Sequence, residues 1–168
     1  MKWKFLLFLL VFGILSAETD EQKATRLHTG DRVPDVSFTT LDGETYTLKE
    51  LQGKVVLINF FATWCGPCNA EIPHLNKDIF QTIKNEDFFM VGIGREHVAD
   101  SLKIFVDKKN ILYPIAPDPE RDIYSHFAEA YIPRNVIIGK DGKILYQCVG
   151  FEKDDFAKMI AVIREELD

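Results

Sequence analysis

The chain has 168 residues, of which 46% are hydrophobic and 27% are charged, and its formal net charge at pH 7 is −6. This length allows one domain with a hydrophobic core of its own, while an acidic chain is poorly suited to bind nucleic acid or an anionic membrane surface. Its three cysteines are an odd number, which disfavours a framework of paired structural disulfides.

Residues 1–17 have the layout of a secretory signal peptide. Two lysines give a basic start, residues 5–15 form an apolar run, and Ser16 and Ala17 are small. The run is too short to cross a bilayer, which takes about 20 residues. Leu15 occupies the position where cleavage after Ala17 favours a small residue, so an uncleaved N-terminal anchor stays open as the alternative.

The next segment, residues 18–29, is polar and charged and is expected to form a loosely ordered lead-in. A single domain then occupies residues 30–168, because no linker or repeat divides them. Without residues 1–17, which hold two lysines and no acidic residue, the net charge falls to −8. The exported chain is therefore more acidic still, and nucleic acid is not expected as a partner.

The first half of the domain has strand periodicity. Residues 36–40 and 44–48 alternate in polarity on either side of Asp42-Gly43, which predicts a β-hairpin. Residues 55–60 are apolar throughout, as expected for a strand that is buried on both faces.

The rest of the domain alternates helical and extended patterns, which indicates an α/β fold. Pro73 lies inside the first helical pattern and should bend it, because proline has no N–H to donate to the carbonyl of Asn69. The expected elements are a helix from Cys65 or Gly66 to about Asn85, a strand over 88–93, a helix over 98–109, an extended segment over 113–116, a helix over 122–131, strands over 136–138 and 144–149, and a helix over 154–167.

Two cysteines stand where the buried strand meets the first helix, in Trp64-Cys65-Gly66-Pro67-Cys68. Residues three apart share a helix face, so this pair can close a small disulfide. The free N–H groups and partial positive charge of a helix N-terminus should lower the pKa of the first cysteine below about 8.5. Such a pair can also be half of a zinc site, but the sequence has no second ligand pair, and no metal or organic cofactor is expected.

This stretch resembles the active site of the thioredoxin superfamily, whose hallmark is Trp-Cys-Gly-Pro-Cys followed by a helix proline. The residues from Val55 to Pro73, the hairpin before them, and the additional helix and extended segment after residue 93 are similar to the TlpA/ResA branch of exported thiol–disulfide oxidoreductases. The resemblance covers about residues 30–167. It implies a thioredoxin fold with an N-terminal β-hairpin and a central αβ insertion.

The position of Cys65 at the strand–helix junction favours it as the nucleophile that attacks a partner's disulfide, and Cys68 is expected to resolve the mixed disulfide. For Trp64, contact with a partner and plain core packing both remain open. The resemblance implies a cis bond between Ile132 and Pro133, with Ile132 offering backbone hydrogen bonds to a bound peptide. The substrate-binding residues expected on these grounds are Trp64, Gly66, Pro67, Ile132 and Pro133.

Glu71 follows Cys68 by three residues and shares its helix face. Asn59 stands where thioredoxins have a buried aspartate, which makes Glu71 the candidate proton acceptor for Cys68. The alternative is a solvated glutamate. Cys148 lies in a predicted strand and is expected to act as a small hydrophobe, with an auxiliary thiol as the alternative. No role can be read for His97.

The sequence therefore predicts an exported, periplasmic thiol–disulfide oxidoreductase that reduces client proteins and is itself reduced by a membrane thiol donor. Gly66-Pro67 is the pair found in thioredoxin, a strong reductant at about −270 mV. A peroxiredoxin-like peroxide reductase is the rival enzyme, but Thr63 is only two residues before Cys65 and no proline precedes it. A non-catalytic thioredoxin-fold module that holds a client protein or copper is the third alternative.

Overall fold

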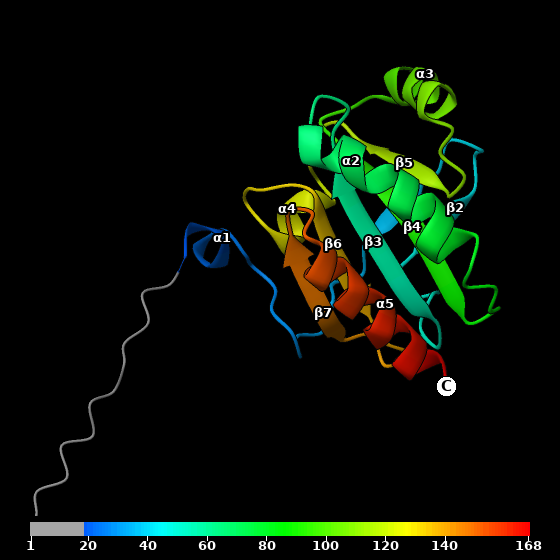
Figure 1. Ribbon diagram of the computed structural model, residues 1–168. Coiled ribbons are helices and arrows are strands. Elements are labelled where there is room, and N and C mark those ends of the chain that lie inside the picture. The colour runs from blue at the N-terminus through cyan, green and yellow to red at the C-terminus, as the bar shows by residue number, and fades with distance from the viewer. Residues whose placement is uncertain (1–18) are drawn as a thin grey trace, which may run out of the picture.

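The computed structural model describes residues 19–168 (Figure 1). The predicted signal peptide over residues 1–17 lies outside the described residues. Within them, no helix is both long enough and apolar enough to cross a membrane.

Five strands form one mixed sheet in the order β5-β4-β3-β6-β7. Strands β3, β4 and β5 run parallel, whereas β6 is antiparallel to both β3 and β7. Every residue of the central strand β3 is buried, as its apolar sequence predicts. The strand bounds are β3 Val55–Phe61, β4 Phe88–Arg95, β5 Ile115–Asp118, β6 Arg134–Ile138 and β7 Ile144–Val149.

Each face of this sheet has its own hydrophobic cluster. Helices α2 (Gly66–His74) and α5 (Lys153–Leu167) lie across one face (Figure 1). The predicted hairpin, formed by β1 (Ser37–Thr39) and β2 (Thr45–Thr47), packs on the other face through residues such as Phe38. The expected α/β architecture with an N-terminal hairpin is present. The remaining elements are α1 Asp20–Lys23, η1 Leu75–Phe80, α3 Ala99–Lys109 and α4 Tyr124–Phe127.

The first long helix differs from its prediction. Helix α2 ends at His74 and continues as the π-helix η1, which ends at Phe80 rather than near Asn85. The change of helix type follows Pro73 by two residues, and a proline inside a helix removes one of the regular hydrogen bonds. The helix therefore starts where the sequence predicts, but its second half is wider and shorter.

The predicted helix over 122–131 is reduced to the four residues of α4. Ala128, the residue after α4, is extended and forms an isolated antiparallel bridge with Thr25. The Tyr124 hydroxyl donates hydrogen bonds to the carbonyls of Ala130 and Tyr131, which bend back over α4. These tertiary contacts replace the later helical turns that local propensity favours.

The lead-in is held against the domain rather than loosely ordered. Ala24 is buried, and the Thr25 hydroxyl accepts a hydrogen bond of 3.1 Å from the guanidinium of Arg134. Gln147 donates to the carbonyl of Leu27 at 2.7 Å. Arg134 is itself fully buried, so this basic residue of β6 anchors the N-terminal segment inside the fold.

Candidate redox site

Cys65 and Cys68 form a disulfide at the N-terminus of α2, with their Cα atoms 5.3 Å apart. Cys65 follows β3 closely and is the N-cap of the helix. The backbone N–H of Cys68 donates to Sγ of Cys65 at 3.2 Å. A donor aimed at this sulfur, together with the positive end of the helix, favours a thiolate there when the pair is reduced.

The two sulfurs differ in their access to solvent. Cys65 is 5% exposed and Cys68 is 1% exposed. Gly66 and Pro67, which lie between them, are both exposed, and Pro67 occupies the first turn, where its missing N–H costs little. The outer edge of the disulfide is therefore the edge that a partner protein can reach.

Trp64 is 63% exposed, so its alternative role as core packing is wrong. The guanidinium of Arg95 lies 5.8 Å from the centre of the Trp64 ring and 5.0 Å from that of Tyr124. Such cation–π contacts orient the indole without burying it. The side chain therefore lies exposed next to Cys65 in the sequence, with one ring face near Arg95.

The peptide bond between Ile132 and Pro133 is cis. The carbonyl of Ile132 lies 3.8 Å from Sγ of Cys65. This segment and the disulfide therefore meet at one end of the sheet, although 67 residues separate them in the chain.

Glu71 is buried, with 1% of its surface exposed, so the solvated alternative is wrong. Its Oε1 accepts a 2.6 Å hydrogen bond from Asn135, and its Oε2 accepts a 3.0 Å hydrogen bond from Asn59. Asn59 also donates to Oδ1 of Asn135 at 2.8 Å. Burial raises the pKa of Glu71 to about 7, against the smaller opposing effects of the two amide donors.

Sequence reasoning missed Asn135. The predicted strand begins at Val136, one residue after Asn135, and only the pairing of β3 with β6 sets Asn135 directly opposite Asn59. An asparagine directly before the apolar run of residues 136–138 is the one signal that could have drawn attention to it. The buried cluster of Glu71, Asn59 and Asn135 is called the carboxyl cluster below.

Cys148 is a free, half-buried thiol on β7 next to the carboxyl cluster. The amide nitrogen of Asn135 lies 3.9 Å from its sulfur. Burial is the largest cause that raises the pKa of Cys148 to about 12, and the neighbouring Glu71 adds to the effect. The thiol is therefore protonated at neutral pH, which makes it a poor nucleophile.

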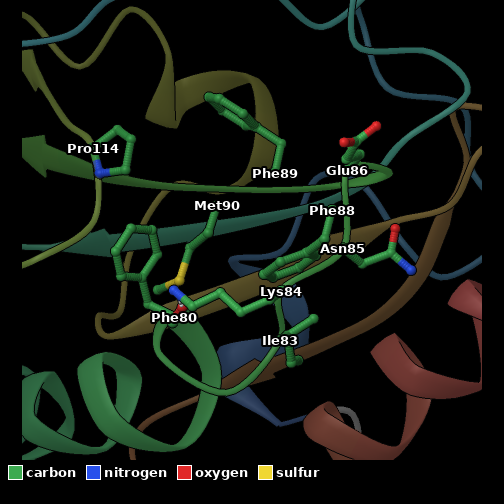
Figure 2. Close-up of a pocket in the computed structure, with 9 residues that line it drawn as sticks. All are labelled: Phe80, Ile83, Lys84, Asn85, Glu86, Phe88, Phe89, Met90 and Pro114. Atoms are coloured by element: carbon green, nitrogen blue, oxygen red, sulfur yellow. Dashed lines mark hydrogen bonds between the residues drawn. The ribbon is translucent and has the colours of Figure 1, made fainter.

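An open apolar groove of about 380 Å³ lies away from the disulfide, between the end of η1 and the start of β4 (Figure 2). None of its lining residues is a cysteine or belongs to the carboxyl cluster, so it takes no part in thiol chemistry. It is lined by Phe80, Ile83, Lys84, Asn85, Glu86, Phe88, Phe89, Met90 and Pro114.

A dithiol at a helix N-terminus that meets a cis-proline segment, with a buried carboxyl group on the same helix, defines a protein that exchanges disulfides with other proteins. The chain belongs to the Redoxin family, whose model matches residues 28–163. It is a thiol–disulfide oxidoreductase of the thioredoxin superfamily and of the TlpA/ResA type, as the sequence predicts.

Curated relatives of the chain carry the same description. The chain is 30% identical over 125 residues to the thiol–disulfide oxidoreductase ResA of Bacillus thuringiensis, an alignment that covers 74% of this chain and 72% of the relative. It is 31% identical over 142 residues to ResA of Oceanobacillus iheyensis, with 80% and 71% covered.

Solved structures agree on the fold. A proposed protein disulfide isomerase from Bacteroides thetaiotaomicron superposes with a TM-score of 0.82 at 35% identity, covering 86% of this chain and 92% of that one. A thiol:disulfide interchange protein of the thioredoxin family from Chlorobium tepidum gives a TM-score of 0.69 at 26% identity, covering 85% and 99%. The predicted thioredoxin fold is confirmed.

Proposed function

We propose that this protein reduces disulfide bonds of exported client proteins in the periplasm. The signal-peptide layout of residues 1–17 supports export, and an uncleaved form would tether the same domain to the membrane. The observation that carries the chemistry is the hydrogen bond of 3.2 Å from the Cys68 N–H to Sγ of Cys65. It gives the better exposed sulfur of the pair a local donor that stabilises its thiolate.

Cys65 is the attacking residue in this proposal. Its thiolate attacks one sulfur of the client's disulfide, and the client's other sulfur leaves as a thiolate that takes up a proton. Cys68 then attacks Sγ of Cys65 in the mixed disulfide, which releases the second client sulfur. The client takes up two electrons from the pair and two protons, of which one comes from solvent because Cys65 attacks as a thiolate, and the Cys65–Cys68 disulfide is formed.

In this proposal Glu71 is the proton acceptor for Cys68. A carboxyl group with a pKa of about 7 can accept a proton from a neighbouring thiol near neutral pH and return it later. Because the carboxyl cluster is closed to solvent, Cys68 keeps its proton until it attacks, and the Glu71 carboxylate accepts the proton at that step. An ordinary surface glutamate, ionised well below neutral pH, would be a much weaker base.

Client binding falls to the residues around the outer edge of the disulfide. Trp64 offers an exposed apolar surface, and the turn of Gly66 and Pro67 leaves space for a chain to approach. Ile132, held next to Cys65 by the cis bond to Pro133, offers its backbone to an extended client segment.

The direction of transfer follows from the residues between the cysteines. Gly-Pro is the pair of thioredoxin, whose potential is about −270 mV, whereas the strong oxidant of this superfamily lies near −120 mV. The exported compartment is oxidising, so a reductant there needs a membrane dithiol that supplies electrons. We therefore assign a membrane thiol donor as the second partner.

The test is equilibration of the protein with dithiothreitol or glutathione redox buffers, with Cys148→Ala as the background that removes the third thiol. We expect a potential within about 40 mV of thioredoxin's value. A potential above about −150 mV would make the protein a disulfide donor and overturn the proposal.

The site of action is tested by N-terminal sequencing of the mature protein. The sequence should begin near residue 18, and soluble cytoplasmic protein that starts at Met1 would contradict export.

A further inference from the structure

His97 contacts the segment that leads into the redox pair, although it lies 34 residues from that segment in the chain. It stands in the loop between β4 and α3 and is half-buried. The backbone N–H of Thr63 donates a hydrogen bond of 3.0 Å to its Nε2. Thr63 joins the end of β3 to Trp64 and Cys65, so this bond acts directly on the approach to the nucleophile.

The rest of this segment is fixed from within its own strand–helix unit. The Asn69 amide donates to the carbonyl of Thr63 at 3.0 Å and to that of Cys65 at 2.7 Å. The N–H of Cys65 donates to the carbonyl of Ala62. His97 adds a hydrogen bond from outside this unit. It binds the Thr63 N–H, whereas Asn69 binds the carbonyls of Thr63 and Cys65.

The loop that carries His97 is itself anchored. The N–H of Glu96 donates to the carbonyl of Asp118 at 2.8 Å. The carboxylate of Asp118 accepts the backbone N–H groups of Ile123 and Tyr124 at the start of α4. The hydroxyl of Tyr124 in turn holds the two carbonyls just before Ile132.

These contacts link the two segments that flank Cys65. One end is the Thr63 N–H, and the other end is the Ile132 carbonyl beside Sγ of Cys65. We propose that neutral His97 is a positioning residue that aligns the Trp64-Cys65 segment with the Ile132-Pro133 segment, and that its protonation releases the alignment. This inference rests on the proposed role of Cys65 as the attacking residue.

The release follows from the chemistry of imidazole. A neutral ring has one nitrogen lone pair that can accept the Thr63 N–H, whereas a protonated ring has none. Burial lowers the pKa of His97, and the nearby Glu96 opposes this to a smaller extent. The ring is therefore neutral at pH 7 and is protonated only in acid.

The charged groups around the ring come from three places. Arg95, the last residue of β4, pairs at 3.4 Å with Glu96 in the following loop, while Arg121 approaches Glu96 at 3.8 Å from beyond β5. Asp100 lies in the first turn of α3, and the first turn of α2 holds no acidic residue. A carboxylate already paired with arginines holds the imidazolium form only weakly.

The structural test is made on the oxidised protein, in which Cys65 and Cys68 do not titrate. The amide signal of Thr63 is followed by NMR from pH 8 to pH 4.5. We expect its shift to change with a midpoint below 6.5, together with the ring signals of His97, and its protection factor against hydrogen exchange, relative to the intrinsic rate at each pH, to fall at least fivefold below that midpoint. In His97→Gln, whose side-chain oxygen accepts the same N–H but does not titrate there, this transition should be absent.

The functional test is the pH profile of client-disulfide reduction. His97→Leu should lower kcat/KM about fivefold at pH 7, the order expected from one lost hydrogen bond, whereas His97→Gln should restore most of the rate and remove the additional loss in acid. His28→Gln, an exposed histidine in the lead-in, is the matched control and should leave both the rate and the profile unchanged.

Two results would overturn the inference. One is a Thr63 amide that keeps its acid transition in His97→Gln. The other is His97→Leu with the rate and profile of the unaltered protein. Because the NMR arm needs no turnover, a normal Thr63 titration in a protein that fails to reduce disulfides would instead count against the proposed function.

Discussion

The two ends of one disulfide lie in opposite surroundings. Around Cys65 the molecule presents an exposed tryptophan and a turn that is open to solvent. Three residues after the buried Cys68 lies Glu71, which is 1% exposed and held by two asparagine amides. The contrast arises because Cys65 is the N-cap at the very start of α2, whereas Cys68 and Glu71 lie within the helix on its buried face.

This difference separates the two tasks of a dithiol reductase. One sulfur has to meet another protein, and its thiolate is favoured by the helix N-terminus and by the Cys68 N–H. The other sulfur has to keep its proton until the mixed disulfide has formed, and a carboxylate out of contact with water can accept that proton when the sulfur attacks. The following experiments test whether the surroundings of Cys65 and those of Cys68 have these separate roles.

The largest effect should come from the cysteines themselves. Cys65→Ala should reduce turnover to background and form no mixed disulfide, whereas Cys68→Ala should also lose turnover but accumulate a client linked to Cys65. Non-reducing gel electrophoresis with mass spectrometry identifies the linked cysteine. Cys148→Ala is the control and should retain activity, while a client found on Cys68 of the Cys65→Ala variant would reverse the roles of the two ends.

The next effect concerns Glu71 and stability. Its folded-state pKa of about 7 lies above the ordinary value of 4.5, so its burial weakens the fold as the pH rises through that interval. The free energy of unfolding of the oxidised protein should fall by about 3 kcal/mol from this group between pH 4.5 and pH 8, and Glu71→Gln should remove that fall. Urea unfolding at both pH values measures it, and an identical pH dependence in the variant would contradict a buried carboxyl group.

A smaller effect should come from Asn135. Asn135→Ala removes the 2.6 Å donor to Oε1 of Glu71, which should raise the pKa of Glu71 by roughly one pH unit. Carboxyl carbon NMR of Glu71 measures that pKa. Asn76→Ala, which removes a surface amide bonded to Asn110, is the matched control and should leave it unchanged. A shift in the control as large as that in Asn135→Ala would mean that the amide acts only through general destabilisation.

The smallest change in stability is expected at the exposed end. Trp64→Ala should change the free energy of unfolding by less than about 0.5 kcal/mol, because the side chain is 63% exposed. It should nevertheless raise KM for a protein client several-fold with kcat little changed, since the lost contact binds ground state and transition state alike. Trp64→Phe should recover part of the affinity. A fall in kcat at constant KM would place the indole in the chemical step instead.

Whether a feature could be predicted depends on how far apart in the sequence its interacting residues lie. The hairpin, strand β3 and the start of α2 were predictable because their signals lie within a few neighbouring residues. Cys65, Cys68 and Glu71 follow one another at intervals of three residues, so their spacing placed each next to the following one on a helix face without any knowledge of the tertiary structure.

Local signals failed where distant segments compete with them. The helix expected over 122–131 ends early because Ala128 pairs with Thr25 and Tyr124 binds two later carbonyls. The lead-in reads as polar and unattached, yet it is held by Arg134, which lies 109 residues from its partner Thr25. Neither set of contacts produces a periodic pattern of residues in the sequence.

The sequence by itself therefore determined the class of chemistry, through two cysteines at the start of a helix that follows a buried strand. The tertiary structure alone decided the surroundings that tune this chemistry. Strand register sets Asn135 opposite Asn59 under the carboxyl group, and the end of β4 brings His97 to Thr63. Covalent spacing fixes contacts within one turn of helix, whereas a hydrogen bond between strands or loops exists only after the sheet has assembled.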